Sequence, residues 1–220
     1  MKYTIEHGPS YALLEMDLAP NEKIMADGGV MTWMSNLTTA TNMTGGIMSG
    51  IKRAIGGESM FLNTYTAGAQ GGSIGIAPGD PGMIVKYPLN GDLYLQKGAF
   101  LCCQEGVKTD LKFQGLRGFF NVGLLSLRLT GQGDVFFGAY GDVEEIDVDG
   151  DIIVDNGHVV AWEPSLQYEL SYRRGVRNFL FAEGMMLRFF GTGKIFVQSR
   201  NPLAMADFMY PFRPVKSDNN

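Results

Sequence analysis

The feature that most constrains the fold is a stretch of eighteen residues that occurs three times. Asn90 to Val107 (NGDLYLQKGAFLCCQEGV) aligns without gaps with Asp149 to Leu166 (DGDIIVDNGHVVAWEPSL) and with Pro20 to Leu37 (PNEKIMADGGVMTWMSNL). Each copy has the pattern of a strand, a two-residue turn and a second strand. A fixed internal repeat is typical of chains built from several similar units. We therefore expect three copies of one supersecondary unit.

The turn at the centre of each copy favours a tight hairpin. Asp-Gly and Asn-Gly dipeptides supply the positive φ angles that a two-residue type I′ turn requires. The aligned turns are Asp27-Gly28, Lys97-Gly98 and Asn156-Gly157, and the aligned positions after them are Trp33, Cys103 and Trp162. We expect these three turns, and these three positions, to be structurally equivalent.

A second block also recurs, and each copy follows a copy of the first. It consists of a glycine, an apolar residue and a cation, then an apolar loop, a strand, a Gly-rich turn and another strand. The copies begin at Gly50-Ile51-Lys52, Gly115-Leu116-Arg117 and Gly175-Val176-Arg177, and their turns contain Gly71-Gly72, Gly131-Gln132-Gly133 and Gly191-Thr192-Gly193. The two blocks together predict units at about 1–77, 78–139 and 140–200, followed by a short C-terminal tail, within a single compact domain of residues 1–220.

Short alternating strands separated by glycine turns indicate an all-β fold of sandwich or barrel type. The 30 glycines and the 19% of charged residues fit such a turn-rich chain. Three similar units bury similar faces most simply around an approximate threefold axis, so a compact pseudo-threefold arrangement is expected. An open solenoid is the alternative.

Charge and composition exclude several classes of function. With 18 basic and 23 acidic residues the net charge is −5, which argues against a broad nucleic-acid surface, although a local basic patch stays open. The sequence has no apolar run of transmembrane length, and its first residues lack the apolar core of a signal peptide. A cytoplasmic protein is therefore expected. Cys102 and Cys103 are neighbours on a strand and face opposite ways, so we expect reduced thiols.

Three motifs resemble catalytic or ligand-binding chemistry, and each has a simpler explanation. Gly71 to Gly75 (GGSIG) matches a nucleophile elbow around Ser73, but no helix follows it. Asp147 to Asp151 offers alternating carboxylates for calcium, yet in an alternating strand these face solvent. Gly45 to Gly50 has the glycine spacing of a phosphate-binding loop but lacks its lysine. We predict no catalytic, cofactor-binding or metal-binding residue and no enzyme activity.

One set of residues recurs with a possible role in binding. Its cations, each in the same place before an apolar loop, and the aromatic residues of two of these loops are Lys52, Arg117, Arg177, Phe119, Phe120, Phe179 and Phe181. Under a threefold axis they lie at one end of the molecule. That end either caps and fills its own units, or binds a partner, a membrane surface or a ligand.

Several segments together resemble one known family over nearly the whole chain. In order they are SGIKRAIGGESMFLNTYTAG, LQKGAFLCC, FQGLRGFF, YGDVEEID and DNGHVVAWEPSLQYEL. They resemble the altered inheritance of mitochondria protein 24 family, also called the mitochondrial biogenesis family, which has many prokaryotic members of unknown function. The resemblance implies a three-repeat all-β fold similar to the tryptophan RNA-binding attenuation protein, arranged as a pseudo-trimer, with no established catalytic residues. The family's mitochondrial role is not expected to carry over to this chain.

The expected function is that of a non-enzymatic assembly or scaffold protein. It would act through protein or surface contacts, as a homo-oligomer or with a protein partner, and peripheral membrane contact stays open. The alternative is a module that binds a small ligand, with RNA as a weaker variant of it. An enzyme of unknown type is the third reading.

Overall fold

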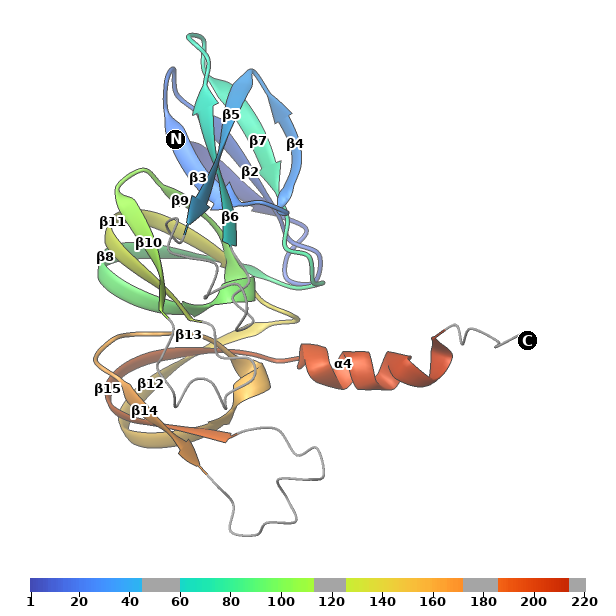
Figure 1. The fold of residues 1–220 in the computed structure, drawn as a ribbon, viewed down its shortest axis with the longest axis vertical. Helices are drawn as coiled ribbons and strands as arrows, with labels where there is room; N and C mark the ends of the chain where they lie inside the picture. Colours follow the sequence, from blue (N-terminus) through green and yellow to red (C-terminus); the bar gives the residue numbers. More distant parts are fainter. Residues whose placement is uncertain (45–59, 113–125, 172–185, 214–220) are drawn as a thin grey trace, which may run out of the picture.

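Antiparallel strands make up most of the computed structural model, which describes residues 1–44, 60–112, 126–171 and 186–213. The all-β class is thereby confirmed. The strands form three successive units along the chain (Figure 1). The first unit contains β1 (Lys2–Glu6), β2 (Leu13–Leu18), β3 (Lys23–Asp27), β4 (Met31–Ser35), β5 (Leu37–Thr44), β6 (Met60–Ala67) and β7 (Gly72–Ile76).

The other two units have fewer and longer strands. The second contains β8 (Ile84–Gln96), the 3-10 helix η1 (Lys97–Ala99), β9 (Phe100–Gln104), β10 (Val107–Lys112) and β11 (Ser126–Gly138). The third contains β12 (Val143–Asp155), the 3-10 helix η2 (Asn156–His158), β13 (Val159–Trp162), β14 (Gln167–Ser171) and β15 (Met186–Gln198). A helix, α4 (Pro202–Met209), and a 3-10 turn, η3 (Tyr210–Phe212), follow.

A long antiparallel pair forms the frame of the second and third units. β8 pairs with β11, and β12 with β15, along their whole lengths, with Gly91 opposite Gly131 and Gly150 opposite Gly191. All four glycines have φ between 116° and 124°, a region that L side chains rarely adopt. Both strands can therefore bend sharply together. The prediction that Gly131 and Gly191 mark hairpin turns is wrong, because they bend continuous strands.

In the first unit the same frame is broken in two. β2 pairs with β7 and β3 pairs with β6. The breaks fall where the other units bend, at Asn21 (φ 62°) and Gly71 (φ 85°). The first unit has additional residues at these places, and they loop out of the ladder. In the first unit, two short strand pairs therefore take the place of the single long, bent pair found in each of the other units.

In each unit a shorter strand pairs with the free edge of one frame strand, and each of these pairs contains a β-bulge. β4 pairs with β7, β9 with β11 and β13 with β15, and each register shifts once along the strand. The residues skipped at these bulges are Thr32, Leu101 and Val160. A β-bulge of this kind is a specific feature of a strand pair rather than a defect. These three strand pairs therefore share one irregular position.

The central turns are not the two-residue hairpins that the dipeptides predict. β8 pairs with β11 and β13, whereas β9 pairs with β11 and β3, so the strands on either side of the turn do not pair with each other. Gly98 and Gly157 lie in η1 and η2, and neither they nor Gly28 have a positive φ. Each turn instead carries the chain from one edge of the long strand to its other edge.

The shared bulge also corrects the predicted equivalence by one residue. Counting from the skipped residues, Met34 corresponds to Cys103 and Trp162, because these three lie opposite Ile74, Val135 and Ile195. Trp33 therefore corresponds to Cys102 and Ala161. By the same count Gly29, and not Gly28, corresponds to Gly98 and Gly157.

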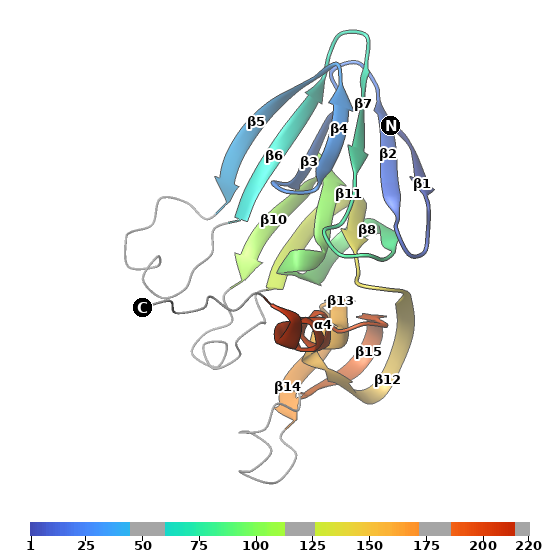
Figure 2. The same ribbon diagram turned by 90° about the vertical axis from the view of Figure 1, so that its right-hand side faces the viewer.

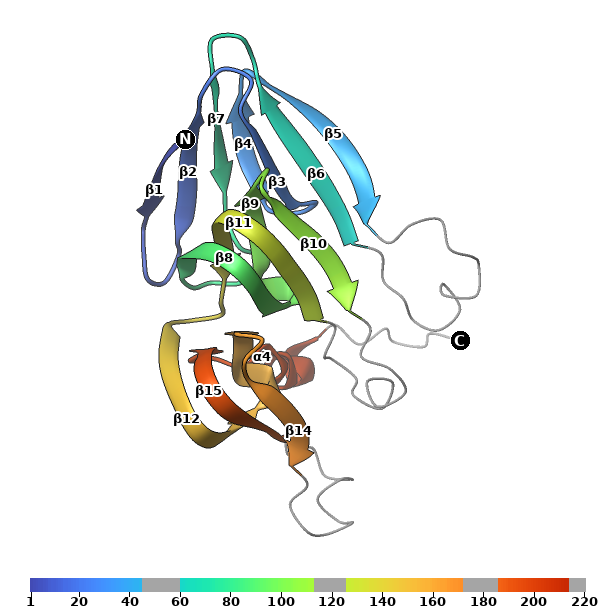
Figure 3. The ribbon, with the colours of Figure 1, turned by 90° about the vertical axis from the view of Figure 1, so that its left-hand side faces the viewer.

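Neighbouring units are joined edge to edge by short strand pairings, which we call joints. In the first joint β3 pairs with β9 through Ile24, Met25 and Ala26. In the second, β8 pairs with β13 through Leu95 opposite Ala161 and Tyr94 opposite Trp162. Among the described strands no pairing connects the third unit to the first. The units form an open row, with the first and third at opposite ends in all three views (Figures 1, 2 and 3).

Each unit has its own hydrophobic core, and the cores of adjoining units share residues. The core of the first unit includes Leu101, Cys102 and Phe136 from the second. The core of the second includes Val160, Ala161 and Phe196 from the third. The third core is formed around Trp162 and Phe189. Joints therefore combine backbone pairing with shared apolar packing.

Candidate functional site

The predicted binding residues fall outside the described part of the chain. These are Lys52, Arg117, Arg177, Phe119, Phe120, Phe179 and Phe181. The structure does describe the strands before and after them. The last described pairs are Thr44 with Met60, Lys112 with Ser126 and Ser171 with Met186. The three segments therefore connect corresponding strands, and their role in binding stays a prediction.

The C-terminal arm, which we define as Pro202 to Phe212, is the most apolar exposed element that the structure describes. None of its residues is buried. Its large apolar side chains are between 46% and 71% exposed, and they are Leu203, Met205, Phe208, Met209, Tyr210 and Phe212. Figure 1 shows α4 projecting sideways from the third unit. Contiguous apolar exposure on this scale marks an interaction surface.

Local contacts hold both ends of the arm. The Asn201 side chain accepts a hydrogen bond from the Leu203 amide (2.9 Å), and Pro202 occupies the first helical turn. At the other end Arg213 donates to the Tyr210 carbonyl (3.0 Å), and its guanidinium lies 3.4 Å from the Tyr210 ring centre. These caps favour the helical conformation of a segment that is short for a helix without tertiary packing. The Asn-Pro pair is a helix-start signal that the sequence contains and that our expectation of a short tail missed.

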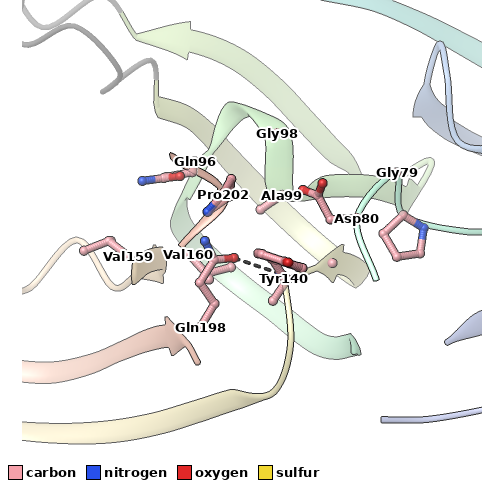
Figure 4. A pocket seen from close by; sticks show the side chains of 13 residues that line it. Gly79, Asp80, Gln96, Gly98, Ala99, Tyr140, Val159, Val160, Gln198 and Pro202 are labelled. Carbon is pink, nitrogen blue, oxygen red and sulfur yellow. Dashed lines mark hydrogen bonds between the residues drawn. The ribbon is translucent and has the colours of Figure 1, made fainter. Parts of the chain in front are cut away.

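A small cavity lies at the base of the arm (Figure 4). It has a volume of about 110 Å³, and its lining includes Pro78, Asp80, Gln96, Tyr140, Gln198 and Pro202. The buried Gln198 amide crosses it: the side-chain oxygen accepts from the Tyr140 amide (2.9 Å) and the nitrogen donates to the Gly157 carbonyl (2.8 Å). Ligand pockets usually measure roughly 300–1,000 Å³. This cavity is therefore smaller than a usual ligand pocket, and Pro202 at the start of the arm is part of its lining.

The two cysteines are fully buried free thiols. Burial raises the pKa of Cys103 to about 12 and, together with its neighbour Cys103, raises the pKa of Cys102 well above its ordinary value. The reactive species of a thiol is the thiolate. Neither residue has the electropositive, accessible setting of a catalytic cysteine. Their side chains instead pack in two different cores, as neighbours on a strand must.

The cysteine pKa values predict a loss of stability at alkaline pH. Because the folded pKa lies above the unfolded one, the native thiol stays protonated while the unfolded thiol ionises as pH rises above about 9. We expect the free energy of unfolding to fall by about 1.4 kcal/mol per pH unit for each thiol in this range. Denaturant unfolding at pH 8, 9 and 10 measures it, with the Cys102→Ala, Cys103→Ala double variant as the control that lacks this slope. An identical slope in both proteins contradicts the assignment.

The motifs that resembled catalytic sites lie in regular strands. Ser73 is an interior residue of β7, paired with Asp17 on one side and Ser35 on the other, and not a residue of a strained turn. On β12 the acidic residues face outward and take part in ion pairs, with Lys194 against Glu145 and Arg188 against Asp151. Within the described ranges no three potential metal ligands come together. Across those same ranges there is no helix with the length and apolar character to cross a membrane.

Comparisons with known proteins match the chain over almost its full length. The family model described as Mitochondrial biogenesis AIM24 matches residues 3–200. The uncharacterized protein M6_Spy0233 of Streptococcus pyogenes serotype M6 is 28% identical, over 99% of this chain and 93% of that protein. The crystal structure of protein SPYM3_0169 from Streptococcus pyogenes is similar with a TM-score of 0.80 and 29% identity, over 96% of this chain and 99% of the other.

Proposed function

The chain belongs to the Mitochondrial biogenesis AIM24 family, and we propose that this member is a cytoplasmic, non-enzymatic assembly protein that binds a protein partner through its C-terminal arm. The observation that carries the proposal is the arm itself. The arm, an eight-residue helix followed by a 3-10 turn, has no buried residue and exposes the aromatic side chains of Phe208, Tyr210 and Phe212. Such a surface becomes favourable when another molecule covers it.

The chemistry of the arm favours a protein partner over a membrane surface. Helices that lie on membranes carry Lys and Arg on their polar face, which interact with anionic lipids. The helix α4 has no basic residue and one acidic residue, Asp207. The net charge of −5 adds repulsion from such a surface. A short apolar helix is instead the usual ligand of a hydrophobic groove on another protein.

The shared architecture of the three units supports an assembly role as well. We infer that they derive from one repeated unit, similar to the tryptophan RNA-binding attenuation protein fold. The common bulge at Thr32, Leu101 and Val160 supports this inference, because an irregularity in the same register is hard to reach independently. A repeated unit offers similar edges for association.

Site-specific photo-crosslinking in cells tests the partner-binding role of the arm. With a benzophenone amino acid in place of Phe208, which is 65% exposed, we expect one discrete adduct with another protein. The same probe at Tyr11, which is 74% exposed but outside the arm, is the matched control and should not give that adduct. A second arm change, Phe212→Ser, should weaken the adduct at position 208 several-fold.

Two results contradict this proposal. One is crosslinking at position 208 only to lipid, together with sedimentation of the protein with vesicles of anionic lipid, which would identify the arm as a membrane element. The other is an adduct pattern at position 208 that is indistinguishable from that at position 11. A bound small molecule in a native mass spectrum of the freshly purified protein would favour the ligand-binding alternative.

A further inference from the structure

Among the described strands with one unpaired edge, two correspond to strands that pair at the joints. Both joints use corresponding strands. In the first joint β9, which follows the central turn of the second unit, pairs with β3, which precedes the central turn of the first unit. In the second joint β13 and β8 pair in the same way. β9 and β13 have such a partner, whereas β4, the corresponding strand of the first unit, has none. β3 and β8 likewise have a partner, whereas β12 of the third unit has none. β4 and β12 are therefore the two halves of a third joint that the chain itself does not form.

Side chains that are buried at the formed joints are exposed at these two edges. On β4, Met34 is 42% exposed, whereas the corresponding Cys103 and Trp162 are at most 1% exposed. Its neighbour Trp33 is 39% exposed, and the corresponding Cys102 and Ala161 are fully buried. At Trp162 part of the cover comes from across the joint, where Tyr94 of the second unit stacks on its ring. β4 has an apolar surface of the kind that a joint requires.

The corresponding segment of β12 shows the same contrast. Ile153 occupies the position of Tyr94, which pairs with Trp162 in the second joint, and Ile153 is 55% exposed. The next residue, Val154, occupies the position of the fully buried Leu95. In the second joint Tyr94 stacks on Trp162 with ring centres 5.5 Å apart. Among the described residues no ring contact of this kind covers Ile153.

The two segments differ in how strongly they are protected against pairing. Natural edges are protected by charged residues, prolines or covering loops. β4 (MTWMS) contains no charge and no proline. On β12 the apolar segment Ile152-Ile153-Val154 lies between Asp151 and Asp155, so this edge keeps a charge on either side of a short apolar stretch. The segments that would face each other are nevertheless both apolar.

We propose that β4 of one copy pairs with the Ile152 to Val154 segment of β12 of a second copy, so that the chain assembles head to tail. The occupant is a second copy because the two edges are complementary halves of a joint that this chain already forms twice. Within one chain they lie on units at opposite ends of the row (Figure 1). The contact is heterologous, so each added copy again presents a free β4 or a free β12, and the assembly grows into a ring or an open chain. This inference is independent of the arm.

Two single variants and their mixture test the pairing in solution. Met34→Lys places a charge in the β4 edge, and Ile153→Lys places one in the β12 edge. Since both side chains are exposed in the single chain, each variant should keep its fold, with a circular dichroism spectrum like that of the wild type. By light scattering we expect the wild type to be oligomeric and each variant alone to be monomeric. Tyr11→Lys, outside both edges, should assemble like the wild type.

The mixture gives the decisive result. The Met34→Lys copy retains an intact β12 and the Ile153→Lys copy an intact β4, so an equimolar mixture should form dimers and nothing larger. A wild type that is monomeric at all concentrations, variants that stay oligomeric, or a mixture that stays monomeric would each overturn the proposal. So would an intramolecular disulfide in a Met34→Cys, Ile153→Cys monomer, which would show that the chain closes on itself. Phe212→Ser should leave assembly unchanged, which separates this test from that of the arm.

Discussion

Replacing Trp162 with alanine is expected to lower the free energy of unfolding by about 3–5 kcal/mol. The side chain is 1% exposed and forms the centre of the aromatic core of the third unit. It stacks on Tyr94 of the second unit and meets Tyr168 and Phe189 edge-on, with ring centres 5.6 and 5.7 Å away. Alanine leaves a cavity where these four rings meet, and it weakens the second joint at the same time. Denaturant unfolding at 25 °C measures the loss.

The chain contains a matched control for this change. Trp33 is the other tryptophan, it lies on the corresponding strand β4, and it is 39% exposed. Its indole packs against Gly75 but is partly solvated, so in the monomeric Ile153→Lys background we expect its replacement by alanine to cost clearly less than the replacement of Trp162. Equal losses for the two variants would contradict the difference in packing between the formed joint and the free edge.

Replacing Gly131 with alanine is expected to cost clearly more than replacing its cross-strand partner Gly91. The two glycines lie opposite each other and have nearly the same φ, 124° and 121°. For either one, a Cβ in this region carries a backbone cost of about 1–2 kcal/mol. Around Gly91 no atom lies within 4 Å of the added Cβ, whereas at Gly131 the Cβ would collide with the Gly106 carbonyl oxygen. Overpacking of this kind adds about 1–3 kcal/mol.

Melting curves of the two variants and the wild type separate these contributions. Gly91→Ala reports the backbone conformation alone, and the difference between the variants reports the contact with Gly106. If both variants lost the same stability, Gly131 would not lie as close to the Gly106 carbonyl oxygen as the structure places it. If neither lost any, the positive φ at this bend would be wrong.

The sequence predicted the class and the succession of strands well, because alternation and glycine spacing are local signals. The alignment without gaps was less accurate. From Leu18 to Leu89, which lie opposite Gly72 and Gly133, the spacing is 71 positions, but from Thr32 to Leu101 it is 69. The spacing of 70 lies between these two values. It therefore matched Trp33 with Cys103, although the pairing places Met34 there.

The turn prediction failed for a different physical reason. Asp-Gly and Asn-Gly favour tight hairpins only when the flanking strands pair with each other. Here the long strand β11 separates β8 from β9 and pairs with both, so the turn spans a strand instead of closing a hairpin. Pairing between residues far apart in the sequence therefore outweighed the local turn propensity, and a dipeptide contains no information about such pairing.

Binding surfaces were the hardest part to predict. The cations Lys52, Arg117 and Arg177 drew attention because they recur within the chain, whereas both proposals rest on exposed residues of the arm, of β4 and of β12. The arm does not recur in the repeat. The edges of β4 and β12 consist of ordinary strand residues. They are exposed because, among the described strands, β4 and β12 do not pair with each other, and the composition of either strand does not predict this.

The arrangement of units in a row, joined only to their neighbours, has a consequence for how the protein comes apart. Each joint is a nearest-neighbour contact, so stability is approximately a sum over units and joints, as in a linear array. The middle unit is held by two joints and each terminal unit by one. In a monomeric variant such as Met34→Lys the row is therefore expected to fray from its ends under mild denaturation, with amide protons of β11 exchanging last and those of β4 and β12 first.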